Sequence, residues 1–326
     1  MPSFSGELDL CPGSKHHRTW FMLLIELDID FSGSQLLQQI IADLRRRNID
    51  MAVARLARAD RPARSGALQK VSTSPLAESF PYISVDKTGQ YLFGASYGGN
   101  VISLNAIGPD GRVTAEPLQV IPVGRNAHSI RTDGSNRFAY VATLGTDQIF
   151  QFNFDAKTGR LSSATPPVLQ MKPSFGPRHF VLSKDNRFMY VLSELQGTVA
   201  TLALDGNTGQ LSEVSSVSGM PPVSKLVPGM PRGAVGTPTA NQAPRNTDND
   251  IWAADIHMTP DERFLYISER TSNSLAALSV HGTNGKLTYL GSTPIEKAAA
   301  RLRHRSHRTF SGRVRREIGD DFGVLD

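Results

Sequence analysis

A chain of 326 residues with one cysteine, Cys11, can bury a substantial core but cannot form an intramolecular disulfide, which fits a reducing, cytoplasmic location. The formal net charge of +5 lies in the flanks: residues 71–297 hold 18 basic and 18 acidic side chains, residues 1–70 hold 10 against 8, and residues 298–326 hold 7 against 4. A neutral middle excludes a basic binding face there, so we expect no nucleic-acid partner.

Residues 1–70 predict a small α/β fragment. The apolar run from Trp20 to Ile25 is too short to span a membrane, so no membrane partner is expected. A helix is predicted over Gln35 to Asn48, because its apolar residues fall on one side and Arg45-Arg-Arg lies at its C-terminal end. A strand is predicted over Ile49 to Leu56.

The order of strand, loop, helix and strand in this flank, with the loop Asp28-Ile-Asp-Phe-Ser-Gly, resembles the core of a STAS domain. STAS domains are regulatory α/β modules of anion transporters and anti-sigma antagonists. The alternative is an unrelated β-α-β fragment. In either case residues 1–70 are not expected to belong to the repeat that follows.

Four segments between residues 74 and 297 follow one strand template. They are Gly89-Gln-Tyr-Leu-Phe-Gly-Ala, Asn136-Arg-Phe-Ala-Tyr-Val-Ala, Asn186-Arg-Phe-Met-Tyr-Val-Leu and Glu262-Arg-Phe-Leu-Tyr-Ile-Ser, and their aromatics Tyr91, Phe138, Phe188 and Phe264 are 47, 50 and 76 residues apart. A second strand follows each, and a glycine turn closes each copy, at Gly111, Gly159, Gly209 and Gly285.

This period of 47–50 residues, with about four short strands per unit, is typical of a β-propeller blade, whereas β-solenoid repeats are usually shorter. We therefore predict an all-β, incomplete propeller of about four to five blades over residues 74–297. The long third interval contains an insertion over residues 219–249, rich in Pro, Gly, Thr and Asn, which predicts an exposed loop. This loop would be either a lid over the channel mouth or a surface segment without function.

Polar residues occur in these strands where a buried blade should have none. The motifs are Ser96-Tyr-Gly-Gly-Asn, Asn126-Ala-His-Ser, Gly176-Pro-Arg-His-Phe, Leu192-Ser-Glu-Leu, Ile251-Trp-Ala-Ala-Asp-Ile-His and Ser268-Glu-Arg-Thr. In these motifs the chain resembles the bacterial lactonase or 6-phosphogluconolactonase family of seven-bladed propellers. The resemblance covers about residues 74–297, in the same order and spacing.

The resemblance implies a catalytic set of His128, Arg178, Glu194 and Arg270 in the central channel. Arg178 and Arg270 would bind the anion and the oxyanion, and His128 with Glu194 would form the acid–base pair. His179 and His257 are further substrate-binding candidates. No metal and no cofactor are expected, because no His, Asp and Glu grouping has a specific ligand spacing.

Structural alternatives stand beside these roles. His128 also fits a structural histidine at a blade edge, and Arg178 fits a solvated residue in the turn after Gly-Pro. Glu194 and Arg270 also fit a structural ion pair between equivalent sites of two repeats. His179 and His257 also fit inter-strand hydrogen bonds, with Asp255 and Trp252 fixing the strand around His257.

The implied function is hydrolysis of an anionic sugar-acid lactone, as in the pentose phosphate pathway. The alternatives are a muconate-type lactone cycloisomerase and a non-catalytic interaction scaffold. The partner is then a small-molecule lactone, and the sequence leaves the oligomeric state open.

Residues 298–326 form a basic tail without a strand period. Codons for residues 298–310 can be chosen so that the same DNA, read with an offset of one base, encodes Gln-Pro-Arg-Gly-Phe-Ala-Ile-Asp-Pro-Thr-Gly-Arg-Phe. This second sequence follows the blade template. We hypothesise that a frameshift replaced a further blade here. An open ring exposes apolar faces, so we expect aggregation or little lactonase activity from this chain.

Overall fold

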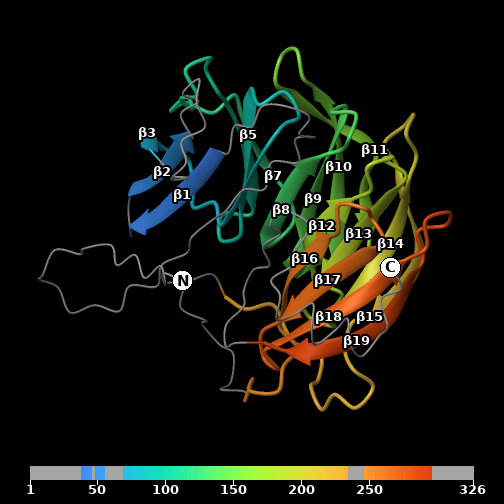
Figure 1. Ribbon diagram of the computed structural model, residues 1–326. Helices are drawn as coiled ribbons and strands as arrows, with labels where there is room; N and C mark the ends of the chain where they lie inside the picture. Colours follow the sequence, from blue (N-terminus) through green and yellow to red (C-terminus); the bar gives the residue numbers. More distant parts are fainter. Residues whose placement is uncertain (1–37, 46–47, 56–68, 234–245, 296–326) are drawn as a thin grey trace, which may run out of the picture.

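The computed structural model describes residues 38–45, 48–55, 69–233 and 246–295 (Figure 1). Four of its sheets have four antiparallel strands each, and we name them blades I to IV in chain order. Blade I comprises β4 (Tyr82–Val85), β5 (Tyr91–Ser96), β6 (Val101–Ala106) and β7 (Gln119–Pro122); blade II comprises β8 (Ala127–Thr132), β9 (Phe138–Thr143), β10 (Gln148–Asp155) and β11 (Arg160–Gln170). Blade III comprises β12 (Pro177–Leu182), β13 (Phe188–Ser193), β14 (Thr198–Leu204) and β15 (Leu211–Ser218); blade IV comprises β16 (Ala253–Met258), β17 (Phe264–Glu269), β18 (Ser274–Val280) and β19 (Leu287–Pro294).

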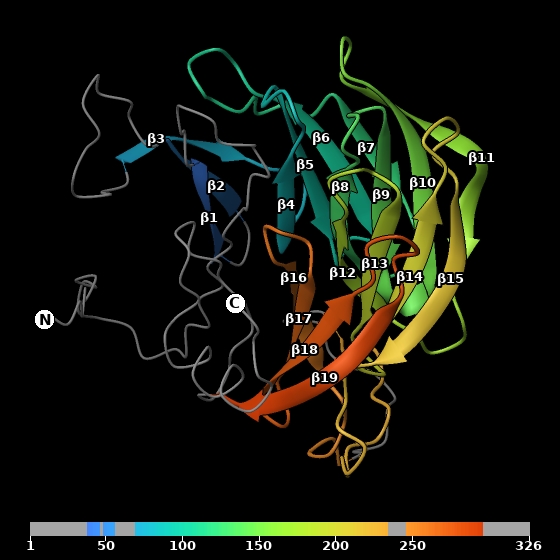
Figure 2. The same ribbon diagram turned by 45° about the vertical axis from the view of Figure 1, so that its right-hand side comes forward.

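Each blade is a meander in which every strand pairs with the next one along the chain. The first strands of neighbouring blades, β4 with β8, β8 with β12 and β12 with β16, contact one another, so the blades follow in sequence around a common centre (Figure 2). The prediction of an all-β, propeller-type repeat is confirmed: the four template segments form β5, β9, β13 and β17, and a further strand follows each of them. Within the described residues the only helical turn is η1 (Leu144–Thr146).

The apolar core lies between the blades, because each second strand is buried on both of its faces. Every residue of β9 is buried, and its Tyr140 packs with Val191 of β13 and Leu202 of β14 between blades II and III. Equivalent clusters join blade I to blade II and blade III to blade IV. Strands buried on both faces read as nearly continuous apolar runs, which explains the repeated template.

The repeated aromatics and the repeated turn glycines meet across blade boundaries. A Cβ atom added to Gly209, in the β14–β15 turn of blade III, would lie 2.3 Å from Cδ1 of Phe138 in blade II. In the same way, one on Gly159 would contact Tyr91 of the preceding blade, and one on Gly285 would contact Phe188. Glycine is required at these turns both for its positive φ and for the close approach of the aromatic ring.

The Gly209→Ala variant should therefore lose about 2–4 kcal/mol of unfolding free energy, because it combines a φ of +73° with a steric overlap on Phe138. Gly206→Ala, in the same connection, is the matched control: nothing lies within 4 Å of its added Cβ atom, and about 0.5 kcal/mol or less is expected. Urea unfolding of both variants measures the difference. Equal losses in the two variants would contradict a role for the glycine–aromatic contact.

The helix predicted over Gln35 to Asn48 is wrong. Residues 38–45 form strand β1 (Gln38–Arg45), which pairs with β2 (Asn48–Arg55), and β2 in turn pairs with β3 (Gln69–Pro75). A short apolar run is ambiguous between helix and strand. The unbroken pairing from Gln38↔Arg55 to Arg45↔Asn48 satisfies the backbone hydrogen-bonding groups in a strand ladder instead. The strand predicted from Ile49 is confirmed as β2. The strand and loop predicted over residues 21–33 lie outside the described residues, as does the basic tail.

The described parts of the insertion, residues 219–233 and 246–249, hydrogen-bond to blade III and to the start of blade IV. The Gly219 and Gly229 N–H groups donate to the carbonyls of Gly197 and Leu195, at 2.9 and 2.8 Å, and the Ile251 N–H donates to Val227 O at 2.8 Å. These contacts attach the insertion to the end of the blades at which β13 terminates. In the described ranges no helix is long and apolar enough to cross a membrane.

Candidate active site

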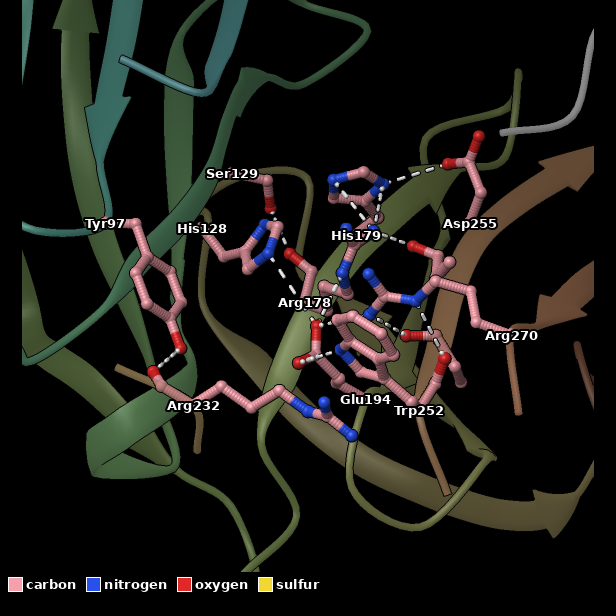
Figure 3. A network of polar contacts seen from close by, with 12 residues as sticks. Tyr97, His128, Ser129, Arg178, His179, Glu194, Arg232, Trp252, Asp255 and Arg270 are labelled. Carbon is pink, nitrogen blue, oxygen red and sulfur yellow. Dashed lines mark hydrogen bonds and ion pairs between the residues drawn. The ribbon is translucent and has the colours of Figure 1, made fainter. Parts of the chain in front are cut away.

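Two structurally equivalent positions of the repeat supply the site. The first is an irregularity in the innermost strand of blades II, III and IV, where the pairing register shifts between Ala127 and Ser129, between Pro177 and Phe180, and between Ala253 and Ile256. A bulge of this kind leaves a residue out of the ladder and turns its side chain. His128, Arg178 and His179 lie in these shifts, which direct their side chains to the common centre (Figure 3).

The second position is the residue that directly follows the second strand of each blade. It is occupied by Tyr97, Leu144, Glu194 and Arg270 in blades I to IV. Because the blades repeat around one centre, these four residues lie at the same end of the propeller. Three of the four are polar, in contrast to the apolar strands that they follow.

Glu194 is the hub of the polar network in Figure 3. Its Oε2 accepts a hydrogen bond from Nε of Arg178 at 2.6 Å and lies 3.3 Å from Nη2 of Arg270, while its Oε1 accepts from the indole Nε1 of Trp252 at 3.1 Å. The carboxylate side chain is only 4% exposed. A buried carboxylate with these donors is held in one orientation.

Both arginines are also fixed by backbone carbonyls of β16 and the residue before it. Arg178 Nη1 donates to Ala254 O, and Arg270 donates from Nε to Trp252 O at 3.0 Å and from Nη2 to Ala253 O at 3.3 Å. Burial, and then the positive charge of Arg178, lower the pKa of Arg270 to about 9. Arg270 remains a cation at neutral pH.

His128 is buried beside this network. Its Nε2 lies 3.8 Å from Glu194 Oε2, and its ring stands edge-on to His179 and Tyr97, with centroids 5.1 and 5.5 Å away. Burial, and then the charge of Arg178, hold the pKa of His128 well below its ordinary value of 6.5. The Nδ1 atom is buried and has no hydrogen-bond partner within the described part of the chain. His128 is therefore a neutral imidazole at neutral pH.

Asp255 joins the two other predicted histidines. Its Oδ1 lies 2.9 Å from His179 Nδ1, and its Oδ2 lies 3.2 Å from His257 Nε2. Burial by itself would raise the pKa of Asp255, but the hydrogen bonds from His179 and His257 hold it well below its usual range. This arrangement places His179 against His128 and keeps His257 one contact farther from the network.

The structure thus brings His128, Arg178, Glu194 and Arg270 together, with His179 alongside. Sequence reasoning missed Arg232, whose guanidinium carbon lies 3.8 Å from the centroid of the Trp252 ring. Arg232 is in the insertion, which has no period from which its position follows. Sequence reasoning also missed that the indole N–H of Trp252 donates a hydrogen bond to Glu194. Over the ranges described, no group of three or more His, Cys, Asp or Glu is arranged to hold a metal ion.

Comparison with known proteins gives the same fold, over a range that contains residues 74–297 and extends beyond them at both ends. The family model described as "Lactonase, 7-bladed beta-propeller" matches residues 47–302. The chain is 34% identical over 232 residues to a 6-phosphogluconolactonase of Serratia proteamaculans and 32% identical over 231 residues to one of Pectobacterium carotovorum. These matches cover 71% of this chain but only 62% of each relative.

A solved structure agrees with the fold. The periplasmic gluconolactonase of Pseudomonas aeruginosa superposes with a TM-score of 0.65 at 23% identity, over 85% of this chain and 72% of that one. The family match extends over well more than half of the chain, and it includes all four blades and each predicted site residue. The chain therefore belongs to the family of seven-bladed β-propeller lactonases.

Proposed function

We propose that this site hydrolyses the lactone ring of an anionic sugar acid, of the 6-phosphogluconolactone type. The observation that carries the proposal is a neutral, buried His128 beside a carboxylate held between two guanidinium groups. The name 6-phosphogluconolactonase of the curated relatives supports it, although this chain spans 62% of their length.

Lactone hydrolysis needs a base for water and a cation for the oxygen that becomes negative. In the proposed reaction His128 takes a proton from water while the water oxygen attacks the lactone carbonyl carbon. Arg178 and Arg270 stabilise the oxyanion. Its collapse breaks the bond between the carbonyl carbon and the ring oxygen, which takes the proton back from His128, so that a carboxylic acid and a free hydroxyl result.

Glu194 is the second member of the proposed acid–base pair. Its Oε2 is 3.8 Å from His128 Nε2, so its negative charge stabilises the imidazolium that forms when His128 accepts a proton. The same oxygen contacts Arg178 and Arg270, which keeps both cations aimed at the reaction centre. His179 and His257, connected by Asp255, are proposed to contact the substrate hydroxyl groups at the edge of the site.

The rate of hydrolysis should fall as the pH is lowered, with a midpoint below 6.5. The active form of His128 is the neutral imidazole, and its depressed pKa preserves that form down to more acidic pH than for a free histidine. The pH dependence of kcat/KM measures this limb. A midpoint at or above 6.5 would contradict His128 as the base.

The direct test of the proposed function is hydrolysis of enzymatically generated 6-phosphogluconolactone by the purified chain. Turnover above the spontaneous rate that is lost in a His128 variant supports the proposal. Turnover that is indifferent to His128, or none in excess of the spontaneous rate, refutes it for this chain. The comparison between chain and variant holds whatever the absolute rate.

We also propose a cytoplasmic location, which the single cysteine supports. Fractionation of the source cells tests it, and recovery of the protein with periplasmic markers would overturn it.

A further inference from the structure

Arg232 reaches the site from the insertion rather than from a blade. Its guanidinium carbon lies 3.8 Å from the Trp252 ring centroid, and that of Arg270 lies 3.6 Å from the same centroid. Two stacked groups this close to one centroid would overlap if they shared a face. They therefore flank opposite faces of the indole, as Figure 3 shows.

The backbone of Arg232 is fixed independently of its side chain. The phenol hydroxyl of Tyr97, at the end of β5 in blade I, donates a 2.7 Å hydrogen bond to the Arg232 carbonyl. Trp252, on which the side chain lies, directly precedes β16 of blade IV. Arg232 thus connects the first and fourth described blades across the centre of the site.

Arg232 raises the positive charge around this centre. Two carboxylates lie against these cations: Glu194, and Glu269, whose Oε1 accepts a 2.7 Å hydrogen bond from the Trp252 backbone N–H and whose charge acts on Arg270. Arg178, Arg232 and Arg270 outnumber them, which leaves an excess of positive charge in a largely buried place. An anionic ligand would compensate it, and a phosphate monoester carries between one and two negative charges at neutral pH.

The side chain also has the geometry that phosphate recognition needs. A guanidinium that lies over the face of an indole still presents its N–H groups in its own plane, where they can form paired hydrogen bonds with phosphate oxygens. Stacking limits its rotamers, so less entropy is lost on binding.

We propose that Arg232 is a specificity-determining residue that binds the phosphate group of a phosphorylated lactone and selects it over the unphosphorylated lactone. This inference rests on the proposed function for the identity of the substrate. Arg178 and Arg270 then serve the reacting carbonyl, and Arg232 serves the distant end of the substrate.

The test compares Arg232→Gln with the parent chain on 6-phosphogluconolactone and on glucono-δ-lactone. Gln keeps the backbone hydrogen bond from Tyr97 and removes the charge. We expect KM for the phosphorylated lactone to rise about 10- to 100-fold, as for the loss of hydrogen bonds to a charged group, with kcat nearly unchanged. Both constants for glucono-δ-lactone should change less than about twofold.

Arg263→Gln is the matched control, because Arg263 also stacks on an aromatic ring, that of Phe264, but is exposed and distant from Trp252. Arg263→Gln should leave KM and kcat unchanged for both lactones. Arg232→Lys, which keeps the charge without the planar fork, should fall between the parent and Arg232→Gln. An equal loss on both lactones, or no loss on either, would overturn the proposal.

Titration with inorganic phosphate by calorimetry separates this proposal from the proposed function. If the parent chain hydrolyses neither lactone, the proposed function fails, and phosphate binding alone decides the role of Arg232. Binding by the parent that weakens at least tenfold in Arg232→Gln and not in Arg263→Gln supports the phosphate site. Equal binding by parent and variant, or none by the parent, refutes it.

Discussion

The His128→Leu variant should lose about 10²- to 10⁴-fold in kcat/KM for lactone hydrolysis while its melting temperature stays the same or rises. The loss follows from removing the proposed base. The retained stability follows from the buried Nδ1 atom, which has no hydrogen-bond partner in the described structure and costs free energy in the parent chain. A leucine of similar volume removes that cost and keeps the contacts with Tyr97 and His179.

Kinetic assays and thermal unfolding of the same preparation test both halves of this expectation. His281→Leu is the control, since His281 is exposed at the turn after β18 and should change neither quantity. If His128→Leu keeps more than about a tenth of the activity, the base is another group. If it unfolds much earlier than the parent, His128 has a structural role instead.

The Glu194→Ala variant should lose about 3–5 kcal/mol of unfolding free energy together with its activity. Glu194 is the shared counter-charge of Arg178 and Arg270, whose side chains are only 11% and 15% exposed. Removing it leaves two buried cations facing each other, which costs more than the lost hydrogen bonds alone. Glu194→Gln keeps the shape and one acceptor oxygen, so its loss should be smaller.

A second glutamate of the chain serves as the control for this prediction. Glu213 pairs with Lys172 at 3.2 Å, but the two side chains are 31% and 67% exposed. Glu213→Ala should therefore cost about 0–1 kcal/mol. Urea unfolding of the three variants measures the difference. Should Glu194→Ala prove as stable as Glu213→Ala, the network around Glu194 is solvated and its proposed electrostatic role is wrong.

The blades were predictable from the sequence because their signals are local and repeated. Each second strand is buried on both faces and closes against a turn that requires positive φ, so aromatic residues and glycines recur at fixed spacing. His128, Arg178, Glu194 and Arg270 were predicted in another way, from the resemblance of their motifs to the lactonase family, and the structure places them at equivalent positions of the repeat. Their convergence follows from the repeat symmetry.

The features that were not predicted from the sequence depend on contacts between residues far apart in the chain. The helix predicted from Gln35 is wrong because pairing with β2 overrides the helical spacing of a short apolar run. Arg232 escaped notice because its place is set by Tyr97 and Trp252, which lie in the first and fourth blades and share no pattern with the insertion. Trp252 carries a visible motif, but its indole bond to Glu194 exists only after two blades have packed together.

The contact between aromatic and glycine at each blade boundary has a consequence for how such a ring can arise. Every described blade carries one of the repeated aromatics on its second strand and one of the repeated glycines in its outer turn, and at the three described boundaries the aromatic contacts the glycine of the blade that follows. A single blade copied in tandem is therefore complementary to its own duplicate from the first copy onward. Gene duplication alone can lengthen such an array, and the polar residues at its two equivalent positions can then diverge without disturbing the joints.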